Sequence, residues 1–591
     1  MNTKEYGPTL PISKEIHETK YRSKGESFKE AMTRVADALK DNEEHYQKFR
    51  EILLEQRFLP AGRIQAAIGA PRSVTPYNCY VSGTIEDSFD SIMDRAKEAA
   101  TTMRLGGGIG YDFSTIRPRG DLIASLDSKS SGPISFMDIF NSVCGTVSSA
   151  GHRRGAQMGV LRVDHPDIEE FIRSKNNSNR LTNFNISVGV TDKFMEAVKS
   201  DSNFDLVFNG RVYKTVRARY LWDELMRSTW DWAEPGVLFI DKMNRKNNLW
   251  YCEVIAATNP CGEQPLPPYG ACLLGSLNLV KYINPVYHYQ TTENGTLLGY
   301  EFDYEAFKHD IEPVVRAMDN VVDVAIYPLK QQEIEAKSKR RMGLGVTGLA
   351  NAGEALGYPY GSPEFLDFTE SVLKVLRDTA YRSSISLAVE KGPFPLFKTE
   401  YLESEFAQSL PEDIRRDIAM YGIRNSHLLS IAPTGTISLS ADNISSGIEP
   451  VFSHKYTRTI ITFDGVKEEE VEDYGLRVFG RMGLSSGSVT VDSHVKVLTT
   501  ASRYVDSACS KTCNVGSGVT WDQFKDIYMQ AWEGGASGCT TFRAEGKRFG
   551  VLKANAAEEV AEPVEPQEDT FVDEGTACYI DPSTGMRVCD E

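Results

Sequence analysis

The sequence predicts a large α/β protein. Residues 237–240 form a short apolar run typical of a buried strand, and residues 204–212 alternate around Asn209-Gly210 as a hairpin does. Residues 365–391 carry apolar side chains at helical spacing and stop at Gly392-Pro393. Because short apolar strands alternate with long helices, we expect strands and helices to share one layered core.

A helical segment is predicted before this α/β region. Residues 27–56 place apolar side chains at helical intervals, and Leu59-Pro60-Ala61-Gly62 ends the pattern. Residues 96–103, which precede a run of glycines, also fit a helix rather than a strand.

Composition excludes some classes of function. The chain has 591 residues, 41% of them hydrophobic, which is enough for a large core. Its formal net charge of -17 argues against nucleic acid as a partner, because proteins that bind a phosphate backbone carry basic patches. A small anionic ligand remains compatible with this charge, since local loops can hold phosphate.

No targeting or membrane segment is recognisable. The first residues lack the apolar core of a signal peptide, and no run of 18 apolar residues occurs. We therefore expect a cytoplasmic protein without membrane contact, whose thiols are kept reduced. The ten cysteines then serve either the core or chemistry; they are Cys79, Cys144, Cys252, Cys261, Cys272, Cys509, Cys513, Cys539, Cys578 and Cys589.

Residues 258–268 form the most distinctive segment. Four prolines disfavour a helix there, and in an extended chain Asn259, Cys261 and Glu263 point to the same side. An amide, a thiol and a carboxylate on one face can hold a polar substrate, react at sulfur and move a proton. A loop thiol near a carboxylate is nevertheless more often structural than catalytic when it stands alone.

Several motifs occur in a fixed order along residues 58–552. They are Asn78-Cys79-Tyr80-Val81, Asp87-Ser88, Gly106-Gly107-Gly108-Ile109-Gly110, His152-Arg153-Arg154-Gly155-Ala156, Asn259-Pro260-Cys261-Gly262-Glu263, Gly275-Ser276-Leu277-Asn278-Leu279, Arg424-Asn425-Ser426, Pro433-Thr434-Gly435-Thr436-Ile437-Ser438 and Ser446-Gly447-Ile448-Glu449-Pro450. Each motif alone is weak, whereas the ordered set is hard to obtain by chance. Together the motifs resemble the catalytic subunit of ribonucleotide reductases.

The resemblance implies a role for each catalytic residue. Cys261 corresponds to the transient thiyl radical that abstracts the ribose 3′-hydrogen, and Glu263 to the base that takes the 3′-hydroxyl proton. Asn259 corresponds to the amide that holds the substrate hydroxyls. Cys79 and Cys272 correspond to the pair that protonates the departing 2′-hydroxyl, supplies two electrons and becomes a disulfide. The implied fold is a ten-stranded α/β barrel with this loop as a central finger.

Two further segments concern the substrate. A loop that opens a helix suits a phosphate, and the resemblance assigns the substrate phosphates to Pro433, Thr434, Gly435, Thr436 and Ile437. Residues 105–110 give G-x-G-x-G, but the last glycine of a dinucleotide fingerprint falls at Tyr111, so we reject a nicotinamide site. The resemblance instead brings the backbone at Gly108 close to the ribose and adds Asn78 to the substrate site.

Allosteric control is also implied. Asp87, Ser88 and Arg117 resemble a site for a deoxynucleotide or ATP effector at the interface of a homodimer. Residues 148–159 resemble the loop that connects effector and substrate base, with Arg153 or Arg154 reaching inward. Too few residues precede Phe58 for an additional ATP-binding domain, so we expect specificity control without an overall activity switch.

The radical source can be predicted from residues 538–543. Family members driven by a ferritin-like partner carry paired tyrosines there, whereas this chain has Thr541 and Phe542. The stretch resembles the adenosylcobalamin-dependent, class II enzymes. Because the cofactor brings its own cobalt, no protein metal site is expected, and we interpret Cys509 and Cys513, four apart on an expected helix, as core residues.

The C-terminal region differs in composition. Residues 554–574 are rich in acidic side chains that repel one another and favour an extended chain. Cys578 and Cys589 fit a mobile tail that reduces Cys79–Cys272 again and receives electrons from thioredoxin or glutaredoxin. The expected organisation is a helical segment at 1–57, a catalytic barrel at 58–552 and a flexible redox tail at 553–591.

Two alternatives stay open. The first is the same chemistry with a separate ferritin-like subunit as the radical source. The second is a nucleotide-binding regulatory protein that has lost catalysis, against which the intact set of Cys79, Asn259, Cys261, Glu263 and Cys272 argues. The sequence leaves open whether the substrate is a diphosphate or a triphosphate.

Overall fold

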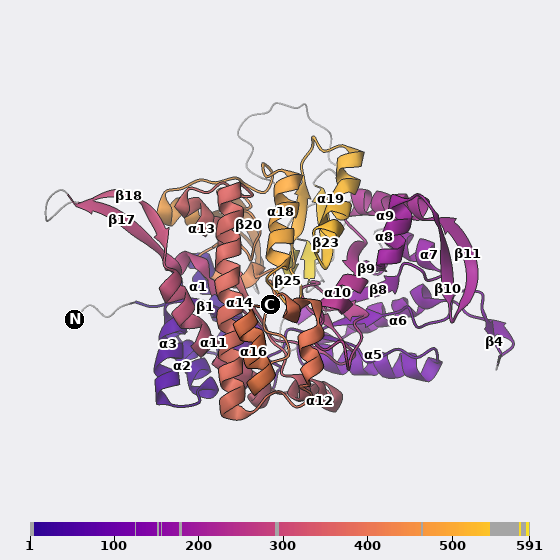
Figure 1. The fold of residues 1–591 in the computed structure, drawn as a ribbon, viewed down its shortest axis with the longest axis horizontal. Helices are drawn as coiled ribbons and strands as arrows, with labels where there is room; N and C mark the ends of the chain where they lie inside the picture. Colours follow the sequence, from indigo (N-terminus) through magenta and orange to yellow (C-terminus); the bar gives the residue numbers. More distant parts are fainter. Residues whose placement is uncertain are drawn as a thin grey trace.

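The computed structural model describes residues 5–124, 126–149, 153–154, 156–176, 180–289, 295–462, 465–543, 546, 578–580 and 587–589. Within these residues the protein is a mixed α/β structure in which helices surround central strands (Figure 1). The predicted class is thus confirmed.

The N-terminal region is helical, as predicted, but residues 27–56 form two helices rather than one. Helix α2 (Phe28–Leu39) ends before Lys40, whose backbone is extended, and Asn42 then caps α3 (Glu43–Leu54) by accepting from the His45 N–H at 2.9 Å. Asparagine favours the N-cap position over the interior of a helix, because its short side chain forms hydrogen bonds with nearby backbone groups. Helix α1 (Pro11–Tyr21) precedes both.

Eight strands form the largest sheet, in the order β15-β2-β3-β8-β9-β12-β23-β22. Strands β2 to β12 run parallel to one another, and β23 turns antiparallel to β12 while β22 follows β23 in parallel. The strands are β15 (Ala271–Cys272), β2 (Cys79–Val81), β3 (Gly108–Asp112), β8 (Gln157–Arg162), β9 (Phe184–Val190), β12 (Gly236–Phe239), β23 (Gly538–Arg543) and β22 (Thr512–Val515).

A second sheet has three strands: β1 (Phe58–Pro60), β16 (Leu274–Asn278) and β19 (Gly343–Thr347). Only Leu273 separates β15 from β16 along the chain, and single bridges join Leu344 to Leu429 and Ile431 to Cys509. The described strands do not form one closed sheet, so the expected ten-stranded barrel is not confirmed at that level.

Helices cover the strands in two groups, each with its own apolar core. One core, at the left and centre of Figure 1, involves α2, α3, α11 (Tyr304–Val324), α13 (Leu349–Leu356), α14 (Pro363–Lys391) and α16 (Glu412–Tyr421). The other involves α5 (Phe89–Arg104), α6 (Pro133–Thr146), α7 (Ile168–Arg173), α8 (Asp192–Lys199), α9 (Ala218–Trp232), α18 (Val491–Ser502) and α19 (Trp521–Glu533). The helices predicted at residues 96–103 and 365–391 are confirmed.

Hairpins extend from this body. The predicted hairpin at Asn209-Gly210 is present as β10 (Asn203–Phe208) and β11 (Arg211–Arg217). Strands β17 (Ile283–Tyr289) and β18 (Gly295–Phe302) form a ribbon that projects from the molecule in Figure 1 and that was not predicted. Strands β20 (Lys455–Thr462) and β21 (Gly465–Glu472) form another hairpin.

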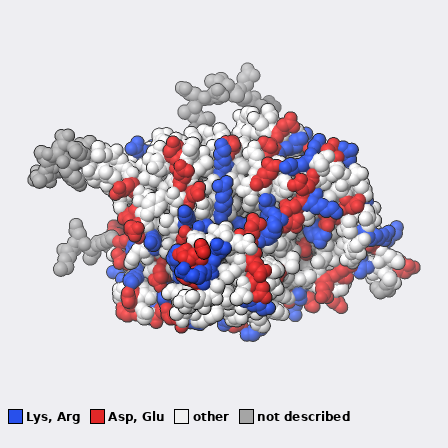
Figure 2. All heavy atoms as spheres, in the orientation of Figure 1, with Lys and Arg blue, Asp and Glu red and all other residues white. Residues whose placement is uncertain are grey.

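The surface is charged but mixed. Figure 2 shows acidic and basic side chains interspersed over the face in view, without one extended basic area. Among the described residues, no helix is both long and apolar enough to cross a membrane.

Candidate active site

The predicted finger is a short hairpin. Strands β13 (Ala257–Thr258) and β14 (Pro265–Leu266) pair antiparallel, and the Gly262 N–H donates to the Asn259 carbonyl at 3.1 Å. Gly262 has a φ of +82°, in the region that glycine tolerates. The expectation of an extended segment with alternating side chains is therefore wrong for residues 259–264, which turn.

The turn nevertheless brings the predicted amide and carboxylate together. Asn259 Nδ2 donates to Glu263 Oε1 at 2.7 Å, while Asn259 Oδ1 accepts from the Gln264 N–H at 3.0 Å. Both side chains are buried, so each needs such partners. Asn259 thus fixes the orientation of the Glu263 carboxylate from within the same loop.

Cys79 and Cys272 lie on neighbouring strands. Strands β2 and β15 pair antiparallel with Cys79 directly opposite Cys272. Both cysteines are buried and reduced, and Cys272 Sγ lies 4.0 Å from Asn259 Nδ2. The predicted reducing pair therefore lies on the part of the largest sheet that is next to the finger hairpin.

The glycine run on β3 makes room for the finger. A Cβ atom added at Gly110 would lie 1.8 Å from the Thr258 carbonyl oxygen, and one at Gly108 would lie 3.1 Å from Cys79 Sγ and 3.2 Å from Pro260 Cγ. Bare backbone at these positions lets the hairpin pass close to the sheet, next to Cys79. Close packing of the finger against β3 therefore explains these glycines, and no dinucleotide-binding site is needed to explain them.

Cys261 lies at the tip of the hairpin and is buried. It is disulfide-bonded, and no other cysteine with a described side chain is its partner, because the remaining seven are reduced. A sulfur in a disulfide carries no thiol hydrogen, so Cys261 has to be reduced before any radical chemistry.

Asn78 is buried beside these residues with an unused amide. Its carbonyl oxygen accepts from the Gly108 N–H at 2.9 Å, whereas neither polar atom of its side chain has a hydrogen-bond partner. Because buried polar groups are normally satisfied, this amide indicates a place where a polar ligand binds.

Residues 433–438 form a tight loop and the start of helix α17 (Gly435–Ser440), as predicted. Thr434 is fully buried, and its hydroxyl contacts Thr347 and Ser438 and accepts from the Gly447 N–H at 2.7 Å. The Thr434 side chain therefore holds the loop in shape, and a phosphate there has to be bound mainly by backbone N–H groups.

Asp87, Ser88 and Arg117 come together at the start of α5. The Arg117 backbone N–H and Nε donate to the Asp87 carboxylate at 3.0 and 2.8 Å, and Ser88 caps the helix. Arg153 and Arg154 form strand β7 opposite Ser148 and Ser149 of β6, but their side chains lie outside the described residues.

Comparison with known proteins settles the family. The family model described as "Ribonucleotide reductase, barrel domain" matches residues 77–474, which include the finger hairpin, Cys79, Cys272 and the predicted phosphate loop. The chain belongs to the ribonucleotide reductase family.

Individual reductases resemble this chain over most of its length. The vitamin B12-dependent ribonucleoside-diphosphate reductase of Thermoplasma acidophilum is 33% identical, with 93% of this chain and 72% of the relative covered. The enzyme of the same description from Mycobacterium tuberculosis is 34% identical, with coverage of 93% and 79%. The ribonucleoside-diphosphate reductase large subunit of Vaccinia virus is 26% identical, with coverage of 65% and 54%.

The end of this reductase chain forms a small hairpin. Strands β24 (Cys578–Ile580) and β25 (Arg587–Cys589) pair antiparallel with Cys578 opposite Cys589, and β25 lies against α17. The predicted acidic linker at residues 554–574 lies outside the described residues.

The prediction for Cys509 and Cys513 was partly wrong. They do not share a helix, since Cys509 precedes β22 and Cys513 lies within it. Cys513 Sγ instead lies 3.9 Å from Cys539 Sγ in the apolar core. The alternation of polar and apolar residues along 512–515 could have indicated a strand.

Sequence reasoning missed two buried ionic groups of this reductase. Lys511 donates to Glu449 Oε2 at 2.7 Å and contacts His494 Nδ1 at 2.9 Å. Asp506 accepts from the Leu428 and Leu429 N–H groups, and burial raises the pKa of its carboxyl to about 6. Lys511 and Asp506 belong to no motif by which they could be found, whereas Glu449 lies in a quoted motif to which no role was assigned.

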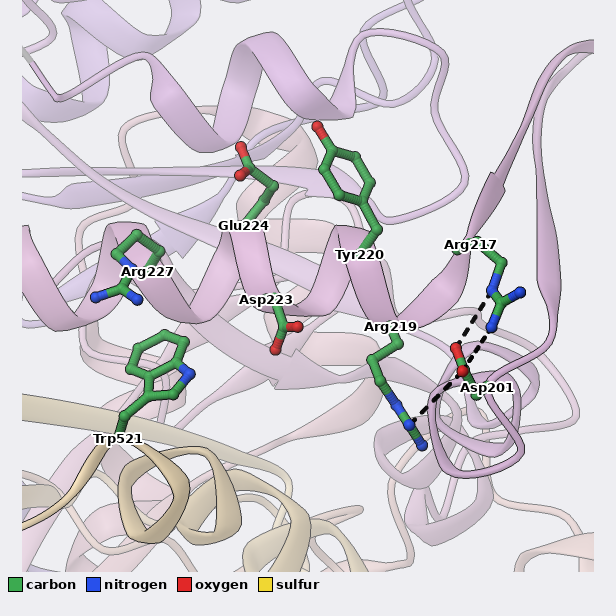
Figure 3. Close-up of a pocket in the computed structure, with 8 residues that line it drawn as sticks. All are labelled: Asp201, Arg217, Arg219, Tyr220, Asp223, Glu224, Arg227 and Trp521. Atoms are coloured by element: carbon green, nitrogen blue, oxygen red, sulfur yellow. Dashed lines mark hydrogen bonds and ion pairs between the residues drawn. The ribbon is translucent and has the colours of Figure 1, made fainter.

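A surface pocket of about 510 Å³ lies between α9 and the start of α19, and Figure 3 shows the residues that line it. Its side chains pair among themselves: Arg217 and Arg219 contact Asp201, and the Arg227 guanidinium lies 4.1 Å from the centre of the Trp521 ring. None of the predicted catalytic residues lines this pocket, and we assign no role to it.

Proposed function

We propose that this chain reduces ribonucleotides to 2′-deoxyribonucleotides for DNA precursor synthesis by a thiyl-radical mechanism. The observation that carries the proposal is the finger hairpin, which holds Asn259 and Glu263 in contact beside Cys272, with Cys79 opposite Cys272 on the wall. An isolated structural thiol does not require this set around it.

The proposed steps use these residues in order. The Cys261 thiyl takes the hydrogen atom from C3′, and Glu263 takes the proton of the 3′-hydroxyl. The 2′-hydroxyl then leaves as water, with its proton from Cys79 or Cys272. These two thiols supply two electrons and become a disulfide, and Cys261 returns its hydrogen atom to C3′. Ribonucleotide and dithiol thus give deoxyribonucleotide, water and disulfide.

Burial supports this sequence of steps. The side chains of Asn259, Glu263 and Cys272 are at most 1% exposed, so solvent is excluded from the reacting atoms. Reduction of the disulfide at Cys261 has to come first, and the pair Cys79–Cys272 has to be reduced again after each turnover. We propose that Cys578 and Cys589 carry those electrons from thioredoxin or glutaredoxin.

Adenosylcobalamin is the proposed cofactor, because the relatives that cover most of the chain are named vitamin B12-dependent. When bound, it supplies the radical that converts Cys261 to a thiyl. Buried polar side chains on the largest sheet suit a ligand with many hydrogen-bond donors and acceptors. Thr512 Oγ1 and Asn514 Nδ2 are buried without partners on β22, and Thr512 stands opposite Thr540 of β23.

The phosphate loop and the strand ends support two further parts of the proposal. Residues 433–437, held in shape by Thr347 and Gly447, would bind the substrate phosphates through the backbone.

The segment with Leu429 and Ile431 bridges Leu344 of β19 on one side and Cys509, just before β22, on the other. This segment thus connects the two sheets, which supports a ten-stranded barrel around the finger. We infer that this barrel, residues 58–552, is the catalytic unit, between the helical segment 1–57 and the redox tail 553–591.

A homodimer with an effector site is proposed at α5. Phe89 and Met93 are one helical turn apart and expose 64% and 40% of their surface, next to Asp87, Ser88 and Arg117. Exposed apolar side chains on one helix face suit a subunit interface. A deoxynucleotide or ATP bound beside them would be sensed by both subunits.

The direct test is product formation. The reduced full chain is incubated with CDP or CTP, adenosylcobalamin and dithiothreitol, and nucleotides are separated by chromatography. We expect dCDP or dCTP together with oxidised dithiothreitol in equal amounts. A folded protein that yields no deoxynucleotide from either substrate, with cobalamin or with a ferritin-like partner, would instead support a regulatory protein without catalysis.

A further inference from the structure

The N-terminal segment reaches the end of the phosphate-loop helix. The backbone N–H groups of Thr9 and Leu10 donate to Asp442 Oδ1 at 2.6 and 2.9 Å, and Thr9 Oγ1 donates to Asp442 Oδ2 at 3.0 Å. Asp442 follows α17 by two residues and is buried. One carboxylate therefore joins two segments that are more than 430 residues apart in the sequence.

Helix α1 adds a second attachment. Ser13 Oγ donates to the Leu439 carbonyl in the last turn of α17 at 2.6 Å, and Ser13 is fully buried. Ile12 and Ile16 share an apolar cluster with Leu439. The Leu439 carbonyl also accepts from the Asn443 N–H at 3.3 Å, so the Ser13 hydroxyl is its second and shorter partner.

The backbone is left-handed at both ends of α17. Asp442 and Asn443 have φ values of +67° and +57°, and Thr434 at the start has +54°. Aspartate and asparagine adopt this region more readily than threonine, which stays there only when contacts hold it. Thr347 and Gly447 hold the start through the Thr434 hydroxyl. The end is held by the N-terminal segment, by Arg477, which donates to the Asp442 carbonyl at 3.0 Å, and by Asn443, whose side chain bonds the Glu472 carbonyl and the Tyr456 hydroxyl.

We propose that Thr9, Ser13 and Asp442 are positioning residues for the substrate phosphates, acting through α17. The inference rests on the proposed function, in which residues 433–437 bind those phosphates. A helix of six residues moves as one body, so a displacement of its last turn shifts the N–H groups of its first turn. Residues 9–13 thus form a clamp that keeps these groups aimed at the phosphates.

A purely structural role for the clamp makes a different prediction. Loss of packing alone would weaken binding of the whole substrate or lower stability. Loss of phosphate alignment would weaken only the part of the affinity that the phosphates contribute. The ratio between the affinities for a nucleotide and for its nucleoside separates the two.

The experiment measures binding of CDP, CTP and cytidine to the reduced full chain by calorimetry. The variants are Ser13→Ala and Asp442→Gly, because glycine removes the carboxylate and tolerates the left-handed backbone at that position. The matched control is Thr19→Ala, because Thr19 lies on the same helix and its hydroxyl bonds only the Glu15 and Ile16 carbonyls within that helix. Circular dichroism melting confirms that each variant is folded.

Of CDP and CTP, the one that the wild type binds more tightly should bind both clamp variants roughly three- to tenfold more weakly, which is the effect of one or two lost hydrogen bonds. The affinity for cytidine should stay unchanged. Thr19→Ala should match the wild type. An unchanged ratio in both folded variants, or an equal loss for cytidine, overturns the inference while the proposed phosphate site stands. If the wild type itself binds nucleotides no more tightly than cytidine, the phosphate site fails and the clamp with it.

Discussion

At the scale of single residues, the contact between Asn259 and Glu263 shows how the proposed base is oriented without the substrate. The amide donates to one carboxylate oxygen at 2.7 Å and is itself held by the Gln264 backbone. Because the three residues belong to one turn, the orientation is set locally and does not depend on distant packing. A preorganised base loses little freedom when the substrate binds.

Replacement of Cys261 by serine tests the radical assignment. Serine keeps the size and polarity of the side chain but has a much stronger bond to hydrogen, so a radical cannot form there readily. We expect turnover to fall to background while nucleotide affinity, measured by calorimetry, stays within about twofold of the wild type. Full turnover by Cys261→Ser would show that another residue carries the radical.

Glu354 predicts how stability depends on pH. Burial, with the nearby Asp473 carboxylate as the second cause, raises the pKa of Glu354 to about 8, and Asn351 Nδ2 donates to both carboxylates. The folded protein thus keeps a proton that the unfolded chain releases near pH 4.5. Stability should therefore fall as pH rises from about 5 to 8, by a few kcal/mol at most.

Glu354→Gln should remove much of this slope, since the amide stays neutral at every pH. Urea unfolding at pH 5, 6.5 and 8 measures it, with Glu301→Gln on the exposed face of β18 as the control. Equal pH slopes in the wild type and in Glu354→Gln would contradict the assignment of that proton to Glu354.

At the scale of secondary-structure elements, the finger and β3 form one unit, and this unit was only partly predictable. The motif at residues 259–263 located the turn of the finger, while the catalytic roles assigned to its residues stay predictions. The shape of the finger was missed, because the four prolines exclude a helix but do not distinguish a strand from a turn. The reason for the β3 glycines became visible only when Thr258 was seen to pass over Gly110.

Gly110→Ala tests this contact. The added methyl would lie 1.8 Å from the Thr258 carbonyl oxygen, so the finger has to move away from β3. We expect kcat to fall on the order of a hundredfold, since small displacements of reacting groups have effects of that size. Overpacking should also cost about 1–3 kcal/mol of stability.

Gly518→Ala is the control for that variant. No atom lies within 4 Å of its added methyl, and its backbone is not left-handed, so rate and stability should stay near wild type. An unchanged kcat in Gly110→Ala would mean that the finger tolerates displacement, and its close packing on β3 would then be irrelevant to catalysis.

At the scale of the whole molecule, the sequence predicted the α/β class but not the layout of the sheets. Alternating short strands and long helices are visible locally, whereas closure of the strands depends on contacts such as the Ile431–Cys509 bridge between distant segments. The projecting β17–β18 ribbon was likewise missed, because its residues do not alternate clearly between apolar and polar.

Phe89→Glu tests the proposed subunit interface. A charge in the centre of an apolar contact is costly to bury, so the variant should sediment as a monomer where the wild type is a dimer. Leu298→Glu provides the control, because Leu298 is equally exposed (65%, compared with 64% for Phe89) but lies on the β17–β18 ribbon. A variant Phe89→Glu that remains dimeric would place the interface elsewhere.

We propose that Cys261 receives its radical by way of adenosylcobalamin. The initial rate of deoxynucleotide formation by the reduced chain is measured with adenosylcobalamin present, with it omitted, and with a ferritin-like radical subunit in its place. We expect a rate that appears only with adenosylcobalamin, saturates as its concentration rises and is lost in Cys261→Ser. Product that forms without cobalamin and depends on the ferritin-like subunit would contradict it.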